Sequence, residues 1–290
     1  MKANPSEKSV SSFITLFNKV HAELHEKIIS FLSQEGYFRP EGTYLDFGCA
    51  SGEFTSLLLS CLNEYSSVYG VDVSSISLMR ARERHRGVQF IDGVVDARGC
   101  AEVPGFLEPA VFIWASRMLG TQPNRVRFLM NLRNALDDNG LVVLRETEYL
   151  WSYGTTILPG LEDRIKQLHK IWLNKKLGRE NEECSDICSI PELGEAAGLE
   201  LITEKQFSTV QTLGNLSSDD KRFMLGSFQN FSSKLISMDQ FESLVGDRML
   251  IDAIYECQKL STFEEMSALY KEIEFSKGAK VYVFRQESGG

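Results

Sequence analysis

Residues 44–54 read YLDFGCASGEF, and this stretch decides the fold more than any other part of the 290-residue chain. Its apolar start predicts a short buried strand over 43–47, and the small residues from Gly48 to Gly52 predict a turn that opens a helix. Such a turn lets a ligand approach the backbone closely at the positive end of the following helix. We therefore expect a cofactor at this turn.

Alternating strand and helix patterns continue on the carboxyl side of the turn. We expect helices at 52–63, 74–86 and 123–136, separated by strands at 67–73, 88–91, 110–115 and 141–145. Five strands separated by helices predict a parallel sheet with helices on both faces. In such a sheet, ligands bind at the carboxyl ends of the strands.

The spacing of the small residues distinguishes two classes of cofactor. A dinucleotide fingerprint has glycine at its first, third and sixth positions, but counting from Gly48 the third is Ala50 and the sixth is Glu53. A glutamate there is bulky where helix and strand should pack closely, and its charge opposes a pyrophosphate. S-adenosylmethionine carries no phosphate and has a positive sulfonium, so the pattern favours this cofactor over NAD or FAD.

Acidic residues follow the next two strands. Asp72 ends the second strand about twenty residues after the turn, where a carboxylate accepts hydrogen bonds from both ribose hydroxyls. Asp96 follows the third strand and is expected at the adenine amino group, a role for which Asp92 competes. The structural alternative is that each aspartate merely caps the following helix.

These residues resemble the motifs of the class I S-adenosylmethionine-dependent methyltransferases. The stretch 46–52 resembles the family's first motif, with Ala50 where glycine is usual, while Asp72 and Asp96 match the ribose-side and adenine-side acids. Further matches lie at 112–118, 139–144 and 191–200. The resemblance implies an α/β fold with a Rossmann-like, seven-stranded sheet whose last strand, near 280–285, is antiparallel, and with helical cap insertions.

The resemblance also divides the chain and assigns its site. The expected segments are an N-terminal helical cap (1–40), an S-adenosylmethionine-binding core (41–148), a helical insertion (149–189), a core continuation (190–207), a second helical insertion (208–276), and the last strand with the tail (277–290). The residues expected to bind the cofactor lie in the turn and at the strand ends: Asp46, Gly48, Cys49, Ala50, Gly52, Asp72, Val73, Asp96, Ala97, Ala115 and Ser116.

The acceptor side gives fewer signals. The residues expected there follow the fifth strand or lie in the first insertion: Glu146, Tyr149, Trp151 and Trp172. Methyl transfer from a sulfonium is an in-line displacement that alignment and desolvation accelerate, so a base is needed only when the acceptor must lose a proton. Candidates for such a base are His21, His25 and Tyr149. For both histidines the alternative is a solvated or packed imidazole.

The composition of the chain limits the kinds of partner that we expect it to bind. The formal charge of -9 and pI near 5.1 argue against a duplex nucleic acid, although they do not exclude a local basic patch. The six cysteines form no C-x-x-C pair, and no metal is expected. No apolar run approaches the roughly 20 residues of a membrane span, so we expect a cytoplasmic protein without a membrane partner.

The sequence therefore predicts an enzyme that transfers a methyl group from S-adenosylmethionine to an oxygen or nitrogen of a small molecule. Two insertions large enough to enclose a pocket favour this hypothesis. One alternative is a non-catalytic S-adenosylmethionine-binding regulator or partner protein, because no catalytic motif is recognisable. The other is a methyltransferase that acts on protein or RNA. The acceptor, its reacting atom and the oligomeric state are not predicted.

Overall fold

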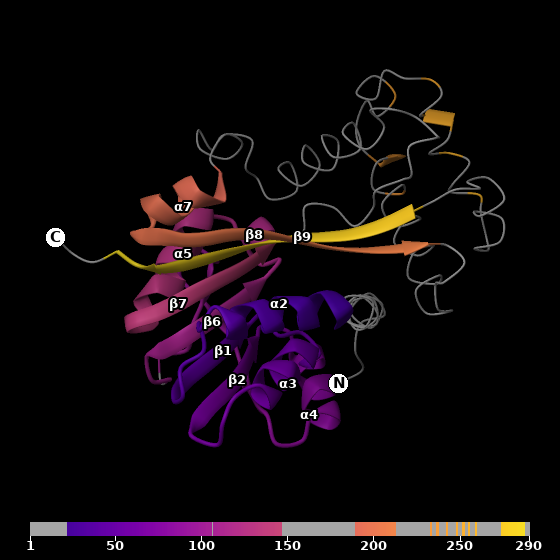
Figure 1. Cartoon of the computed structure of the whole chain (residues 1–290). Coiled ribbons are helices and arrows are strands. Elements are labelled where there is room, and N and C mark those ends of the chain that lie inside the picture. The colour runs from indigo at the N-terminus through magenta and orange to yellow at the C-terminus, as the bar shows by residue number, and fades with distance from the viewer. Residues whose placement is uncertain are drawn as a thin grey trace. The chain divides into compact units, whose positions relative to one another are not determined.

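The computed structural model describes residues 22–105, 107–146, 189–212 and 274–287, and nine single residues in the region 233–259. The chain divides into two compact units, one formed by 1–148, 183–207 and 278–290, the other by 149–182 and 208–277. In the first unit, Figure 1 shows a twisted sheet flanked by helices. The candidate site is built from this first unit.

Seven strands form the sheet. They are β1 (Gly42–Phe47), β2 (Ser66–Asp72), β3 (Gln89–Asp92), β6 (Ala110–Ser116), β7 (Leu136–Glu146), β8 (Leu199–Thr212) and β9 (Glu274–Gln286), in the order β3-β2-β1-β6-β7-β9-β8. Within this sheet, neighbours among β3, β2, β1, β6 and β7 pair in parallel, and β9 is antiparallel to β7. The predicted seven-stranded sheet with an antiparallel last strand is confirmed. Its strand order reverses between β1 and β6, which is where parallel sheets of this kind bind ligands.

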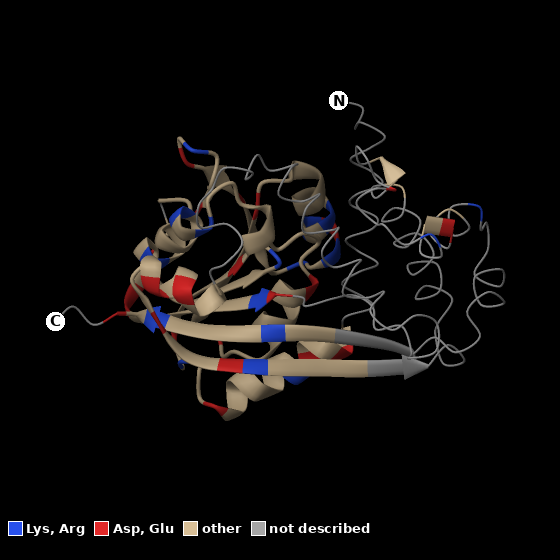
Figure 2. Cartoon of the chain, turned by 90° about the horizontal axis from the view of Figure 1, so that it is seen from above, with Lys and Arg blue, Asp and Glu red and all other residues tan. Residues whose placement is uncertain are grey.

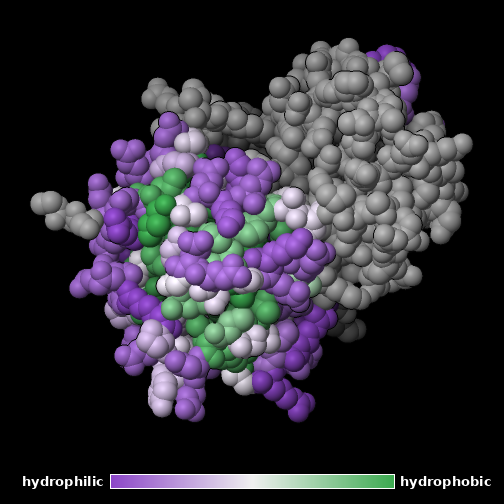
Figure 3. Space-filling view, viewed as in Figure 1, coloured by the Kyte–Doolittle hydropathy of each residue, from purple (hydrophilic) through white to green (hydrophobic). Residues whose placement is uncertain are grey.

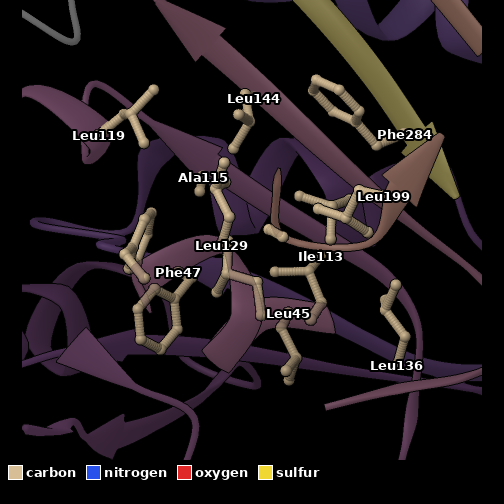
Figure 4. Packing of buried hydrophobic residues seen from close by; sticks show 14 of the residues in the cluster. Leu45, Phe47, Ile113, Ala115, Leu119, Leu129, Leu136, Leu144, Leu199 and Phe284 are labelled. Atoms are coloured by element: carbon tan, nitrogen blue, oxygen red, sulfur yellow. The ribbon is translucent and has the colours of Figure 1, made fainter. Parts of the chain in front are cut away.

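In the described part of the chain, helices cover both faces of the sheet. The helices α2 (Ala22–Gln34), α3 (Glu53–Ser60) and α4 (Ser75–Arg84) pack on one face, and α5 (Arg125–Asn134) and α7 (Ile190–Ala196) on the other. Side chains alternate along each strand: Trp114 joins the core beneath α2 and α3, and its neighbour Ala115 joins the core beneath α5. Figure 4 shows this second core, where Leu45 of β1, Ile113 of β6 and Leu129 of α5 lie close together.

Side-chain caps fix where the helices begin. The Ser74 hydroxyl accepts a hydrogen bond from the Ser77 amide, as the sequence predicts for the start of α4. The predicted start of α5 at Pro123 is wrong by two residues: the helix begins at Arg125 because the Asn124 side chain accepts from the Arg127 amide.

Several elements differ from the predicted ones. The prediction lacks a hairpin of β4 (Val94–Val95) and β5 (Ala101–Glu102) and a short 3-10 helix, η1 (Leu119–Thr121). A segment of two or three residues is too short to show a periodic pattern of apolar residues. Strand β8 continues past the expected end at 207 to Thr212. The helical insertions expected at 149–189 and 208–276 lie almost entirely outside the described residues, as does the part of the expected N-terminal helical cap before Ala22.

Polar and apolar side chains are distributed in the ordinary way on the described surface. Hydrophilic residues cover most of the visible face in Figure 3, with apolar residues showing between them. No helix in the part of the chain that the structure describes is long and apolar enough to cross a membrane.

Candidate functional site

The predicted turn lies at the point where the strand order reverses. Phe47 at the end of β1 is level with Val71 in β2 on one side and with Ala115 in β6 on the other. The next residues, Gly48, Asp72 and Ser116, therefore meet at one edge of the sheet. This is the carboxyl edge, where the sequence places the cofactor.

Two glycines let the turn fit between its neighbours. A Cβ atom on Gly48 (φ +82°) would lie 2.4 Å from the Met118 sulfur, and one on Gly52 (φ +83°) would lie 2.6 Å from the Phe90 ring. The positive φ disfavours a side chain at both positions, and a Cβ atom at either one would force its neighbour, Met118 or Phe90, to move. Ala50 between them also has a positive φ, +49°, at a cost of roughly 1–2 kcal/mol for a residue with a Cβ.

The amide groups of the turn are directed at the protein. The Gly48 and Cys49 amides both donate to the Val71 carbonyl, at 2.7 and 3.0 Å, and the Ala50 amide donates to Asp72 Oδ2 at 2.9 Å. A phosphate-binding turn directs such groups at its ligand. The turn is therefore poorly suited to a pyrophosphate, in agreement with the glycine spacing.

Asp72 is held so that it can still accept further hydrogen bonds. Its Oδ1 accepts from the Ser74 amide at 2.8 Å and its Oδ2 from the Ala50 amide. A carboxylate has about four acceptor positions, so Asp72 can still accept a hydrogen bond from a ligand hydroxyl. Burial raises the pKa of this carboxyl above its ordinary value, although the backbone donors oppose that shift.

Asp46 lies deeper, within β1. Asp46 is only 2% exposed, and its Oδ2 accepts a 2.6 Å hydrogen bond from the Thr55 hydroxyl of α3. Burial, followed by the nearby charges of Asp72 and Glu53, raises its pKa to about 7. A cationic ligand at this edge would favour the ionised form.

Asp96 is fully engaged in the structure. Its Oδ1 accepts from the Arg98 and Cys100 amides at 2.8 and 3.0 Å, within the β4–β5 hairpin. Its Oδ2 accepts from Arg127 Nε at 3.0 Å and from Asn131 Nδ2 at 3.3 Å, both on α5. Arg127 is the main reason that the pKa of Asp96 lies well below its usual range.

The competing aspartate is more accessible. The Asp92 side chain is 73% exposed and makes a 3.4 Å contact with Arg82. It is level with Asp72 in the parallel pairing of β2 and β3, so the two carboxyl groups follow neighbouring strand ends. The geometry therefore favours Asp92 over Asp96 for a hydrogen bond to a ligand, whereas Asp96 joins the hairpin to α5.

Exposed valines lie beside these aspartates. Val73 is 62% exposed, and Val94 and Val95 are 45% and 56% exposed. A Cβ atom on Gly93 would lie 3.3 Å from the Val73 side chain, so the end of β2 and the segment after β3 are in contact. A flat apolar ligand group would cover these side chains. Val73 is among the residues that the sequence predicts to bind the cofactor, whereas Val94 and Val95 are not, because a strand of two residues is too short to show a pattern.

Some predicted cofactor residues face the core instead. Cys49 packs against Leu78, Ala81 and Phe90, and Ala115 is fully buried on the α5 face. These two can reach a ligand only through backbone atoms. Ala97 is exposed in the hairpin.

The substrate-side predictions are only partly within the described residues. Glu146 is half-buried at the end of β7, where burial raises its pKa to about 7 and Oε1 accepts from the Leu119 amide at 3.2 Å. His25 is buried in α2 against the Phe54 ring, which stacks on Trp114. The other residues predicted there lie outside the described part: His21, Tyr149, Trp151 and Trp172.

Comparisons with known proteins identify the family of this chain. Residues 18–204 match a family model described as a methyltransferase domain. Carboxy-S-adenosyl-L-methionine synthase from Trichodesmium erythraeum is 25% identical over 184 residues, which cover 61% of this chain and 70% of that protein.

Two solved structures are also similar. The YcgJ protein from Bacillus subtilis is 13% identical to this chain and has a TM-score of 0.49. The alignment covers 90% of this chain and 98% of that protein. The plantazolicin methyltransferase BamL, solved in complex with a triazolic desmethylPZN analog and SAH, is 15% identical, covers 97% and 91%, and has a TM-score of 0.46.

Proposed function

Because this chain belongs to the S-adenosylmethionine-dependent methyltransferase family, we propose that it transfers the methyl group of S-adenosylmethionine to an oxygen or nitrogen of a small molecule. The transfer is an in-line displacement. The acceptor atom forms a bond to the methyl carbon, the carbon–sulfur bond breaks, and its electron pair stays on sulfur to give S-adenosylhomocysteine.

The observation that carries the cofactor assignment is the geometry of Asp72 and the turn. Asp72 is fixed by two backbone amides and retains lone pairs for the ribose hydroxyls. We assign the ribose to Asp72, the adenine to the side of Val73, Asp92 and Val94, and the methionine end to Asp46 and Ser116. The negative charge of Asp46 favours the sulfonium of the substrate over the neutral product.

The charged residues of α4 support a small acceptor over a nucleic acid. Arg82 donates to the Phe90 carbonyl at 2.8 Å and contacts Asp92, and Arg84 lies 3.1 Å from Glu53. These guanidinium groups are therefore paired within the protein. Figure 2 shows basic and acidic residues interspersed along the described elements.

His25 is a poor base for this reaction. Burial, reinforced by the positive charge of Arg145, lowers its pKa to about 3. A general base works best when its pKa lies near the operating pH. We therefore propose that His25 remains neutral, as a packing group or a hydrogen-bond partner, and that no proton is transferred to it.

Calorimetric titration of the full chain tests the cofactor. We expect micromolar binding of S-adenosylmethionine and S-adenosylhomocysteine and no binding of NAD. Binding of NAD in preference to both would overturn the assignment.

Product analysis tests the reaction. We expect S-adenosylhomocysteine and a methylated product when the protein is incubated with S-adenosylmethionine and a panel of small acceptors. Cofactor binding without turnover across a broad panel would favour a regulatory protein, and turnover that requires protein or RNA would favour a macromolecular acceptor. The Trichodesmium relative is named for making a carboxylated cofactor, so a nucleoside product heavier than S-adenosylmethionine would favour that chemistry instead.

A further inference from the structure

Glu146 is a carboxylate at the carboxyl end of β7. Ser116, the last residue of β6, is level with Arg145 in the parallel pairing of these strands, so Glu146 lies one residue beyond that level. Adjacent strands of a sheet are about 4.8 Å apart. Glu146 therefore lies at the same edge of the sheet as Ser116, to which we assign the methionine end of the cofactor.

The segment that follows β6 connects this carboxylate to the glycine turn. The Met118 side chain lies directly against Gly48, where it leaves no room for a Cβ atom. The next residue, Leu119, donates its amide to Glu146 Oε1 at 3.2 Å. Consecutive residues thus contact the turn and the carboxylate, and this holds Glu146 beside the cofactor edge.

The Glu146 carboxylate keeps one oxygen for a ligand. Among the residues that the structure describes, it receives the Leu119 hydrogen bond at Oε1 and none at Oε2. The residue is half-buried, and Oε2 is not one of the enclosed polar atoms of the described residues that lack a partner. Since a carboxylate has about four acceptor positions, Glu146 can accept a hydrogen bond from a bound molecule.

The surroundings of this carboxyl set how strongly it holds a proton. Burial raises the pKa of Glu146 to about 7. The Leu119 amide opposes this shift, and so do the charges of the arginines after β6, in β7 and at the start of α5: Arg117, Arg145 and Arg125. A group whose pKa lies near the operating pH can both take up and release a proton in each turnover.

From its place at the edge and its unoccupied oxygen we propose that Glu146 is the general base of the reaction and that the methyl acceptor is a hydroxyl group. An ionised carboxylate only accepts hydrogen bonds, so its partner must carry a proton. A hydroxyl has to lose that proton when its oxygen is methylated, whereas a neutral amine attacks through its lone pair and loses a proton afterwards. This inference rests on the proposed methyl transfer and selects oxygen over nitrogen.

The step needs no reactant besides the acceptor and S-adenosylmethionine. The acceptor oxygen forms a bond to the methyl carbon while the carbon–sulfur bond breaks, and the electron pair of that bond stays on sulfur. The proton of the hydroxyl passes to Oε2 of Glu146, and from there to solvent after the product leaves.

Two probes of similar shape test the contact directly. Phenol, whose hydroxyl has a pKa near 10 as in tyrosine, and fluorobenzene, which has no donor, are each titrated at pH 8 onto the full chain saturated with S-adenosylhomocysteine. We expect phenol to bind about tenfold more tightly than fluorobenzene in the wild type, because Glu146 is ionised at this pH. Equal binding of the two probes overturns the proposal.

Glu146→Gln is the decisive variant. Its carbonyl oxygen can still accept from the Leu119 amide, while an NH2 group replaces the unoccupied oxygen. We expect this variant to lose the preference for phenol. The control Glu200→Gln, which changes an exposed glutamate paired with Arg285 at the level of Leu141, away from the carboxyl edge, should keep it. An unchanged preference in Glu146→Gln contradicts the contact.

A pH profile separates a base from a merely structural carboxylate. With a hydroxyl acceptor from the panel, kcat/KM of the wild type should rise with pH through about 7 and then stay constant, because Glu146 acts in its ionised form. The cofactor is kept saturating, so that Asp46 does not enter the profile. Glu146→Gln should lower kcat by about 100-fold or more, with little change in KM, and lose the inflection. A flat wild-type profile overturns the proposal even if the variant does not fold.

The cofactor also carries a group that a carboxylate could bind, the ammonium of its methionine end. We expect Glu146→Gln to bind S-adenosylhomocysteine as the wild type does, within about twofold. A loss of about tenfold, with unchanged binding of 5′-methylthioadenosine, which lacks the amino acid, would assign Glu146 to the cofactor and overturn its role as the base.

The outcomes distinguish this inference from the proposed function. If the wild type does not bind S-adenosylhomocysteine or methylates no acceptor, the proposed function itself fails. If it methylates amines or thiols but no hydroxyl, methyl transfer holds and only the role of Glu146 fails.

Discussion

At the scale of the residue, the candidate site depends on how many hydrogen bonds each carboxylate already makes. Asp72 accepts from two backbone amides and Asp96 from four donors, although both follow strands in the sequence. A carboxylate offers about four acceptor positions, so only Asp72 has capacity left for a diol. The number of hydrogen-bond donors around a carboxylate distinguishes a ligand-binding aspartate from a structural one. This number cannot be read from the sequence.

Asp72→Ala tests the residue that we assign to the ribose. We expect S-adenosylhomocysteine to bind more weakly by about 1–3 kcal/mol, because the ribose hydrogen bonds and the acceptor for the Ala50 amide are lost together. Calorimetric titration measures the change. Asp137→Ala is a matched control, because Asp137 pairs with Arg39 near the start of β7, away from the site. Unchanged affinity in Asp72→Ala would mean that the ribose lies elsewhere.

At the scale of the element, the β4–β5 hairpin is attached to α5 through the side chains of Asp96 and Asn131, the second of which also donates to the Ala101 carbonyl at 3.1 Å. The Asp96 side chain is 6% exposed, and its contacts with Arg127 and Asn131 join segments more than thirty residues apart. The hairpin has only four residues in its strands, so we expect these contacts to contribute to its position, together with the hydrogen bond from the Ala101 amide to Gln122. Val94, which we assign to the adenine side, lies in this hairpin.

Asp96→Ala and Asp92→Ala form a pair that tests this division of roles. We expect Asp96→Ala to lower the melting temperature by several degrees, because four donors lose their acceptor. Asp92→Ala should leave the melting temperature nearly unchanged and weaken cofactor binding, since its carboxylate is exposed at the strand end. Thermal unfolding and calorimetry measure the two effects. The reverse pattern, with Asp96→Ala stable but impaired in binding, would restore the adenine role to Asp96.

At the scale of the whole molecule, buried ionisable groups couple folding to pH. The pKa of Asp46 is about 7 in the folded protein, against an ordinary value of 3.8. Between these values the folded state holds more protons than the unfolded state, so this group makes the free energy of unfolding fall as the pH rises from 4 to 7. Above pH 7 its contribution is constant.

Asp46→Asn should remove this dependence. Asparagine keeps an acceptor for the Thr55 hydroxyl but carries no charge to bury. Relative to the wild type, the variant should therefore gain stability as the pH rises from 4 to 7, by up to about 4 kcal/mol for a shift of about three pKa units. Urea unfolding at a series of pH values gives the difference, with Asp92→Asn as an exposed control. Parallel curves for Asp46→Asn and the wild type would contradict the assigned pKa.

The sequence by itself determined the order of strands and helices, the glycine turn and the acid at the end of β2. These features depend on local physics: the period of apolar residues, the steric needs of a turn, and a fixed spacing within one strand–helix–strand unit. Local rules failed where elements were short, as in the β4–β5 hairpin, and where a side chain set a helix start, as at Asn124.

Only the tertiary structure decided which polar groups meet. The donors that occupy Asp96 come from α5, and Arg145 reaches Ser116 across 29 positions of the sequence. Arg145 is a charged residue at the end of the otherwise apolar run 141–145, and its hydrogen bond to Ser116 follows from the parallel pairing of β6 and β7. Hydrogen-bond partners and burial depend on segments distant in sequence, and no local pattern encodes them.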